Sequence, residues 1–138
     1  MTKIVLLIDD DEDDAQFFSE ALSEIAPDLG LEYCNSGKQA LDKLDHPQSR
    51  TPDIIFLDLN MPALNGWECL RELKKKAGLQ QIPIVMYSTA NLHREGVTPN
   101  DVGATAFYQK SNSFNELKTT LADLLKAILH HECRVTSG

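Results

Sequence analysis

Positive charge is scarce in this sequence. The 138 residues include 13 Lys and Arg against 21 Asp and Glu, which leaves a net charge of −8. A nucleic-acid-binding surface needs clustered basic residues to meet the phosphate backbone. The one basic run, Lys74 to Lys76, is better explained as the solvated end of a helix. We therefore expect no nucleic-acid partner.

Long hydrophobic runs are also missing. No apolar stretch approaches the ~20 residues that span a membrane. The amino-terminal run Ile4 to Ile8 is too short for a signal peptide. The sequence thus predicts a cytoplasmic protein that has no membrane partner.

Cysteine is rare and scattered. Cys34, Cys69 and Cys133 are odd in number and widely spaced, which argues against a disulfide framework and against a Cys-x-x-Cys metal knuckle. His130, His131 and Cys133 resemble a set of metal ligands. A helix end followed by a frayed tail explains them more simply, and we assign no metal site there.

Short apolar runs alternate with amphipathic ones, which favours βα units around a parallel sheet. Three runs are continuous and largely β-branched, as in strands buried on both faces, and two more are weaker strand candidates. With 42% hydrophobic residues, the chain can bury one core. We expect one α/β domain over residues 1–129, a tail over 130–138 and no output domain. The predicted strands are Ile4 to Ile8, Leu31 to Cys34, Ile54 to Leu57, Ile82 to Tyr87 and Ala104 to Tyr108.

Amphipathic segments between these strands predict helices. The last is the clearest, because the apolar residues from Phe114 to Ile128 fall within about 100° of arc. Leu129 lies outside that arc and hints at contact with a second copy or a partner. Gly96 and Pro99 interrupt the fourth segment, which predicts a short or frayed helix. That fourth segment is Asn91 to Val102. The first predicted helix carries its apolar residues, from Phe17 to Ile25, on one side, and Pro27 follows it. The other two predicted helices are Ser36 to Leu44 and Trp67 to Lys76, with Ser36 and Asn65 as their caps.

Polar side chains follow the predicted strands at their carboxyl ends, the edge at which open α/β sheets place their ligand-binding and catalytic residues. Asp9 and Asp10 follow the first strand, Asp58 the third, Ser88 the fourth and Lys110 the fifth. Each alone has an ordinary explanation as a helix start, a turn, a cap or a surface residue. Their occurrence together at successive strand ends favours a site.

Three carboxylates brought close together repel one another, so a site that holds them ionised needs a cation. An all-oxygen ligand set favours Mg²⁺, with Mn²⁺ as an alternative, and such an ion leaves room for an incoming ligand. A phosphoryl group fits, because metal, ammonium and hydroxyl groups can together neutralise its oxygens during transfer. Asp58 would then be the nucleophile that forms an acyl phosphate.

These residues resemble a known family, the receiver domain of response regulators in bacterial two-component systems. The matching segments are Lys3 to Asp10, Leu57 to Pro62 with Asn65-Gly66 after it, Pro83 to Ser88 and Gly103 to Lys110. The resemblance implies a doubly wound, flavodoxin-like sheet of five parallel strands in the order 2-1-3-4-5, with helices on both faces.

The resemblance also implies roles at the metal site. Asp58 matches the phosphorylated aspartate. Asp10 and Asp58 match the carboxylates that bind Mg²⁺ directly, the backbone carbonyl of Asn60 matches the remaining protein ligand, and Asp9 is placed to act through water.

The family's switch residues have counterparts as well. Ser88 matches the hydroxyl that turns toward the phosphoryl group, and Lys110 matches the ammonium that contacts it. Phe107 matches the aromatic residue that swings inward on activation, although this position is often Tyr and the neighbouring Tyr108 is an alternative mobile ring.

Four further positions are notable. Ser111 stands where the family usually has Pro, often after a cis peptide bond, so the bond before it could be trans or strained. Thr89 stands where Ala or Gly is common and could narrow the entrance to Asp58. Gly66 is expected to adopt a dihedral angle that other residues avoid, and Trp67 is expected to pack in the core.

The favoured function is a phosphoacceptor module that receives a phosphoryl group from a histidine kinase or a histidine phosphotransfer protein. Its chemistry would be limited to Mg²⁺-dependent phosphorylation and autodephosphorylation of Asp58. We expect it to signal to a downstream protein through the fourth helix, the fifth strand and the fifth helix, a surface that could also form a homodimer.

Two other functions use similar residues. An aspartyl-phosphate phosphatase usually has a second acid two residues after its nucleophile, where this sequence has Asn60. A flavodoxin-like cofactor binder needs a loop that cradles phosphate after the first strand, where the run Asp9 to Asp11 would repel it.

Overall fold

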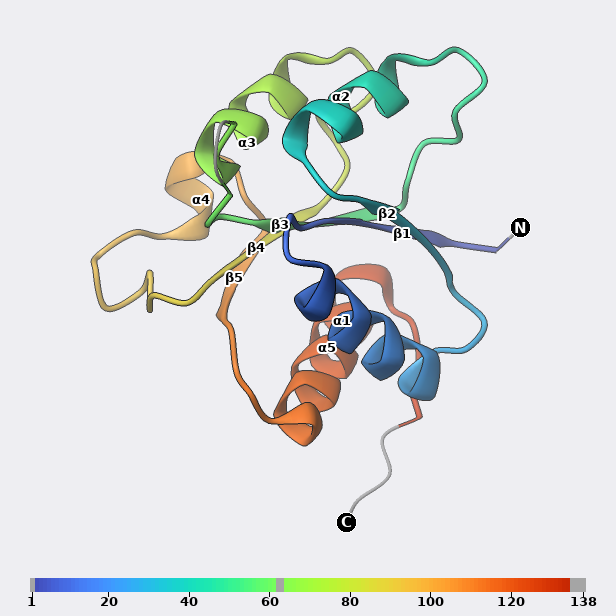
Figure 1. Cartoon of the computed structure of the whole chain (residues 1–138), viewed down its shortest axis with the longest axis vertical. Coiled ribbons are helices and arrows are strands. Elements are labelled where there is room, and N and C mark those ends of the chain that lie inside the picture. Colours follow the sequence, from blue (N-terminus) through green and yellow to red (C-terminus); the bar gives the residue numbers. More distant parts are fainter. Residues whose placement is uncertain (1, 62–63, 135–138) are drawn as a thin grey trace.

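A central sheet of five parallel strands forms the middle layer of the computed structural model, which describes residues 2–61 and 64–134 (Figure 1). The strands lie in the order β2-β1-β3-β4-β5, so the chain changes direction across the sheet after β2. This order confirms the doubly wound architecture expected from the sequence. The bounds are β1 Ile4–Ile8, β2 Gly30–Cys34, β3 Ile54–Asp58, β4 Ile84–Ser88 and β5 Ala106–Gln109.

Helices cover both faces of this sheet. Figure 1 shows α1 and α5 together on one face and α2, α3 and α4 on the other. Because both faces are covered, β3 and β4 are buried along their whole length, as their continuous apolar runs predicted. The helices are α1 Glu12–Ile25, α2 Gly37–Asp45, α3 Gly66–Lys75, α4 Pro99–Val102 and α5 Phe114–Leu129.

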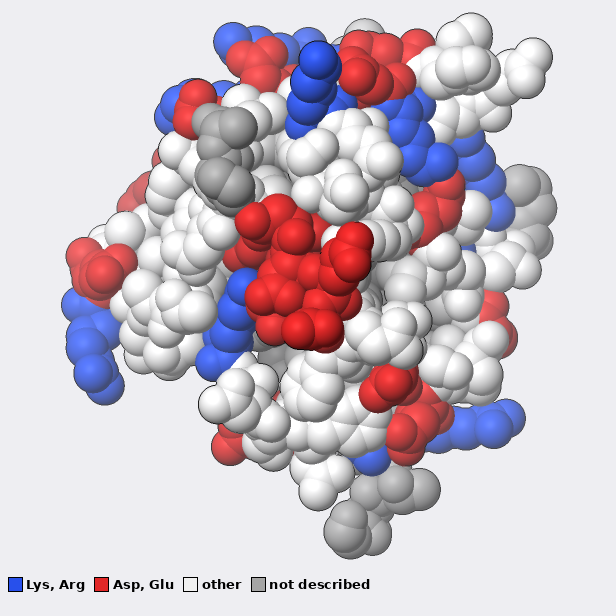
Figure 2. Space-filling model, in the orientation of Figure 1, with Lys and Arg blue, Asp and Glu red and all other residues white. Residues whose placement is uncertain are grey.

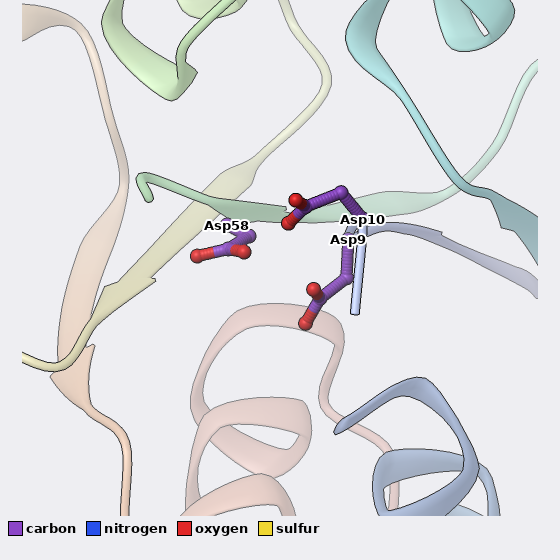
Figure 3. A group of neighbouring side chains, drawn as sticks. All are labelled: Asp9, Asp10 and Asp58. Atoms are coloured by element: carbon purple, nitrogen blue, oxygen red, sulfur yellow. The ribbon is translucent and has the colours of Figure 1, made fainter. Parts of the chain in front are cut away.

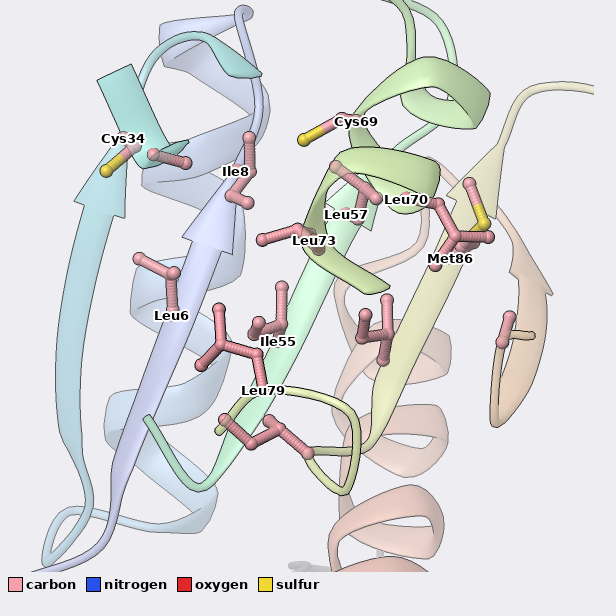
Figure 4. Packing of buried hydrophobic residues seen from close by; sticks show 14 of the residues in the cluster. Leu6, Ile8, Cys34, Ile55, Leu57, Cys69, Leu70, Leu73, Leu79 and Met86 are labelled. Carbon is pink, nitrogen blue, oxygen red and sulfur yellow. The ribbon is translucent and has the colours of Figure 1, made fainter. Parts of the chain in front are cut away.

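Alternate side chains of the strands fill two hydrophobic cores. In β1, Leu6 and Ile8 belong to the core beneath α2 and α3 (Figure 4), whereas Val5 and Leu7 belong to the core beneath α1 and α5. Successive residues of a strand point to opposite faces, so one apolar run supplies both cores. Trp67 is partly buried against the first core, which confirms its expected packing role.

Side chains cap the amino-terminal ends of α1, α2 and α3. Asp11 accepts the backbone N–H groups of Asp13 and Asp14 at the start of α1. The expected caps Ser36 and Asn65 are confirmed, and Asn65 forms a reciprocal capping box with Glu68. These caps fix where each helix leaves the carboxyl edge of the sheet.

Two strands are shifted from their predicted bounds. The ladders of β4 and β5 begin at Ile84 and Ala106, two residues later than predicted, and β4 extends to Ser88. Ile82 and Ala104 are buried, yet neither belongs to a strand. An apolar run indicates that residues are buried, whereas a strand also requires backbone hydrogen bonds to a neighbouring strand. Pro83 has no N–H to donate to such a bond, so the strand begins after it.

The fourth helix is a single turn. Of the segment Asn91 to Val102, only Pro99–Val102 is helical, which confirms the expected short helix. Gly96 has a φ of 82°, outside the helical region, and Pro99 supplies the first helical residue. Leu92 is nevertheless buried in the first core, so the non-helical part of the segment packs on the body of the domain.

The chain after α5 folds back on the domain as far as it is described. The N–H of Arg134 donates to the carbonyl of Ile25 at 2.7 Å, and Cys133 packs against the second core. The expected frayed tail is therefore wrong for residues 130–134, and the rest of the tail lies outside the described residues. Leu129 is also half-buried against the second core, which removes the reason to read it as a contact for a second copy.

Among residues 2–61 and 64–134, no helix combines the length and the hydropathy that a membrane span requires.

Candidate phosphoacceptor site

Three carboxylates meet at the carboxyl edge of the sheet. One oxygen from each of Asp9, Asp10 and Asp58 lies within 4.8 Å of the other two (Figure 3). Asp9 and Asp58 are each 1% exposed, whereas Asp10 faces solvent. Figure 2 shows a patch of acidic side chains at the centre of this face, where β1 runs into α1 in Figure 1. Buried carboxylates this close together favour a bound cation.

Asp58 offers a free oxygen. Its Oδ1 accepts the N–H of Asn60 at 3.0 Å and lies 3.3 Å from the ammonium of Lys110. Its Oδ2 is buried and has no hydrogen-bond partner among residues 2–61 and 64–134. A buried carboxylate oxygen without a partner is costly unless a ligand completes it. The residues therefore fit a hard divalent cation such as Mg²⁺ and a phosphoryl group.

Asp9 is held by two donors. Its Oδ1 accepts the N–H of Asp11 at 2.9 Å, and its Oδ2 accepts the hydroxyl of Tyr87 at 2.6 Å. Burial, with a smaller contribution from the charge of Asp58, raises the pKa of Asp9 to about 7 despite these hydrogen bonds. Burial followed by the Asp58 charge also raises the pKa of Asp10.

Lys110 lies among three carboxylates. Its Nζ is 2.8 Å from Asp14 Oδ2, 3.3 Å from Asp58 Oδ1 and 4.0 Å from Asp9 Oδ2. Burial alone would lower the pKa of Lys110, but its hydrogen bond to Asp14 and the charges of Asp9 and Asp58 raise it above the ordinary value. The ammonium therefore stays charged, as a contact to a phosphoryl group requires.

Ser88 is turned toward Asn60. Its hydroxyl donates to Oδ1 of Asn60 at 3.1 Å and accepts the N–H of Ala90 at 3.1 Å. The Asn60 oxygen also accepts the N–H of Thr89 at 3.1 Å. A move of Ser88 toward a phosphoryl group on Asp58 would have to break its bond to Asn60.

The ring of Phe107 lies between two other rings. Its centroid is 6.1 Å from that of Trp67 and 5.8 Å from that of His93, and its side chain is 8% exposed. Tyr108 belongs to the opposite face, where it stacks on Tyr87 at 5.1 Å. The two candidate switch rings thus lie in different cores.

Gly66 is required for a different reason from the one expected. The described glycines with positive φ are Gly78, Gly96 and Gly103, so the expectation of an unusual dihedral at Gly66 is wrong. A Cβ at Gly66 would lie 2.5 Å from the Cα of Leu59 and 2.6 Å from the carbonyl oxygen of Asp58. Glycine therefore lets α3 begin directly against the strand that carries Asp58.

The loop after β5 has ordinary peptide geometry. The described part of the chain has no cis peptide bond, so the bond before Ser111 is trans. Thr89 is exposed, its carbonyl accepts the side chain of Gln109 at 2.9 Å, and with Lys110 it lines a cavity of about 310 Å³ beside the carboxylates. Thr89 therefore lies in the wall of a cavity that Asp9 and Asp14 also line, and its narrowing of the entrance to Asp58 stays a prediction.

Sequence reasoning missed two residues of the site. Asp14 was not singled out from the sequence, and Tyr87 was placed only at the end of a predicted strand. Two signals were available. Asp14 lies one helical turn beyond the acidic pair, and Tyr87 directly precedes Ser88, so its side chain leaves β4 on the opposite face.

Comparisons with known proteins agree with this geometry. The family model described as "Response regulator receiver domain" matches residues 5–122. The response regulator Rcp1 of Synechocystis is 28% identical over 119 residues, which cover 83% of this chain and 81% of that protein. Some relatives are longer: a protein-glutamate methylesterase/protein-glutamine glutaminase of Methanosarcina mazei is 32% identical, and the match covers 33% of it and 84% of this chain.

Solved structures show the same likeness. The phosphorylated cyanobacterial phytochrome response regulator RcpA has a TM-score of 0.81 and 26% identity, over 94% of this chain and 95% of that one. The response regulator TrrA of Thermotoga maritima, in complex with Mg²⁺ and beryllofluoride, has a TM-score of 0.70 and 27% identity, over 90% of this chain and all of that one.

Proposed function

Because the chain belongs to the response regulator receiver domain family, we propose that Asp58 is the residue through which it acts as a phosphoacceptor signalling module. The observation that carries this assignment is the buried Oδ2 of Asp58, which lies in a cluster of carboxylates and has no hydrogen-bond partner in the described part of the chain. Receiver domains bind Mg²⁺, and the cluster here fits it. We assign direct ligation to Asp10, Asp58 and the carbonyl of Asn60, with Asp9 acting through water.

The residues of the chain have distinct tasks in this reaction. An oxygen of Asp58 attacks phosphorus and forms a P–O bond, while the P–N bond of the donor phosphohistidine breaks and the imidazole leaves with the electron pair. Bound Mg²⁺ neutralises charge on the phosphoryl oxygens. Lys110 contacts another of these oxygens, and Ser88 donates to the phosphoryl group after leaving Asn60. Attack by water on phosphorus later breaks the P–O bond and restores the carboxylate.

The donor belongs to the class that serves this family, a histidine kinase or a histidine phosphotransfer protein. The chemistry of the chain is confined to its own Asp58, and Asn60 stands where a phosphatase would have its second acid. Cytoplasmic location stays a prediction from the sequence.

The output surface is formed by α4, β5 and α5, where a downstream protein or a second copy binds. Phe107 on β5 supports this assignment, because its ring contacts His93 in the segment that leads into α4, and β5 pairs with β4, which ends at Ser88. Because α4 is short, most of this segment forms turns, with backbone hydrogen bonds such as that from the N–H of Glu95 to the carbonyl of Asn91, and its packing can shift at lower cost than that of a continuous helix.

Mass spectrometry of the chain after incubation with Mg²⁺ and phosphoramidate tests the assignment. We expect one added phosphoryl group, which is lost in Asp58→Asn and retained in Asp123→Asn, a control at an exposed acid of α5. Phosphorylation that persists in Asp58→Asn would show that another residue is the acceptor.

A further inference from the structure

Tyr87 reaches the site from beneath the sheet. It lies on β4 next to Ser88, but its side chain belongs to the core under α1 and α5 and is 4% exposed. A buried phenol hydroxyl needs a hydrogen-bond partner. Here the partner is Oδ2 of Asp9, at 2.6 Å. Burial raises the pKa of Tyr87 well above its ordinary value, so the hydroxyl remains a donor.

The ring of Tyr87 makes two further contacts. The ring of Tyr108 stacks on it with a centroid distance of 5.1 Å and an interplanar angle of 14°. The ammonium of Lys110 lies 5.3 Å from the centroid of the Tyr87 ring, within the range of a cation–π contact. Tyr87 therefore touches both the carboxylate of Asp9 and the ammonium that serves Asp58.

The hydroxyl of Tyr87 restrains Asp9. With Oδ1 bonded to Asp11 and Oδ2 bonded to Tyr87, the Asp9 carboxylate cannot rotate without losing a hydrogen bond. If the hydroxyl were removed, the nearest remaining cation for Oδ2 would be Lys110, now at 4.0 Å. Asp9 would then turn toward Lys110 and away from the position that the carboxylate cluster requires.

We propose that Tyr87 is a positioning residue of the phosphoacceptor site, which holds Asp9 in place and thereby sets the affinity for Mg²⁺. The inference rests on the proposed function of the carboxylate cluster. Tyr87 would then contribute to metal binding, a role that its buried position in a strand does not suggest. The alternative is that Tyr87 only fills the core, in which case its ring would matter and its hydroxyl would not.

Tyr87→Phe separates these roles, because it removes the hydroxyl and keeps the ring and its stacking. Calorimetric titration of the full chain with Mg²⁺ should show binding weakened about tenfold, as expected for loss of a hydrogen bond to a charged group. Tyr108→Phe is the matched control, because Tyr108 is the stacked neighbour and, in the described part of the chain, has no hydrogen bond to Asp9. It should bind Mg²⁺ like the unchanged protein.

A double-mutant cycle tests whether Tyr87 acts through Asp9. In an Asp9→Ala background, Tyr87→Phe should change the Mg²⁺ affinity by less than about twofold, which is the deviation from additivity typical of substitutions that do not interact. Asp9→Asn replaces Asp9→Ala if the latter does not fold. Raising Mg²⁺ to saturation should restore the phosphorylation rate of Tyr87→Phe, whereas a folding defect would not respond to the metal in this way.

The outcomes separate the inference from the proposed function. If the unchanged chain is not phosphorylated at Asp58, the proposed function fails. If Asp58 is phosphorylated but Tyr87→Phe binds Mg²⁺ as tightly as the unchanged chain, only the inference fails. An equal loss of affinity in Tyr108→Phe, or an undiminished effect of Tyr87→Phe without Asp9, would also overturn it.

Discussion

The ammonium of Lys110 lies 2.8 Å from the carboxylate of Asp14, closer than its 3.3 Å contact with Asp58. Asp14 lies in the first turn of α1, and Lys110 follows β5 on the other side of the site. The residue that should stabilise a phosphoryl group on Asp58 is thus shared with an acid outside the carboxylate cluster. A phosphoryl group must compete with Asp14 for Lys110.

Release of Lys110 from Asp14 should favour the phosphorylated state. In Asp14→Asn we expect beryllofluoride, a phosphoryl mimic, to bind with Mg²⁺ about two- to fivefold more tightly, the range for a partly exposed ion pair. Fluorescence or calorimetric titration measures this. Asp13→Asn is the matched control, since Asp13 is an exposed neighbour in the same turn. Unchanged or weaker binding in Asp14→Asn would contradict the competition.

The raised pKa of Asp9 predicts how the metal-free protein responds to pH. The folded state keeps the Asp9 proton up to about pH 7, whereas the unfolded chain loses it near the ordinary value of 3.8. The folded state therefore binds more protons across this window, and its stability should fall as pH rises from about 4 to 7, by on the order of a few kcal/mol. Urea unfolding without Mg²⁺ measures the slope, which Asp9→Asn should flatten. An equal slope in Asp9→Asn would assign the effect to other groups.

Trp67 should report the movement of Phe107. It is the only tryptophan of the chain, and its ring lies 6.1 Å from that of Phe107. Addition of Mg²⁺ and beryllofluoride should change its fluorescence if Phe107 leaves its place between Trp67 and His93. Lys110→Ala should still bind Mg²⁺ but lose the fluorescence change, because Lys110 contacts the phosphoryl group and not the cation. The same response in Phe107→Leu would show that another group moves.

Gly66 should tolerate no side chain. In Gly66→Ala the new Cβ would lie 2.5 Å from the backbone of Leu59, and we expect a loss of stability of about 1 to 3 kcal/mol, typical of overpacking. Gly78→Ala is the control, because Gly78 has a φ of 84° but nothing within 4 Å of its Cβ position. Only the strain of positive φ applies there, about 1 kcal/mol. Urea unfolding of both variants decides whether close approach or backbone conformation matters more.

The sequence alone determined which functional groups lie together at the site. These polar residues lie at the end of a strand or just after it, and parallel strands end at one edge of their sheet, so their convergence follows from the order of elements: Asp9, Asp10, Asp58, Ser88 and Lys110. The apolar runs likewise predicted the buried centre of the sheet, because burial on both faces permits no polar alternation.

Only the tertiary structure decided how the side chains pair within the site. The hydroxyl of Tyr87 meets Asp9 across 78 residues of sequence, and Lys110 meets Asp14 across 96. The Lys110 contact depends on where α1 packs against the sheet, and both contacts depend on which rotamer each side chain adopts. Neither contact produces a periodic pattern in the sequence. The pattern of strands placed the carboxylates together, but the tertiary packing of side chains determined which donors restrain them.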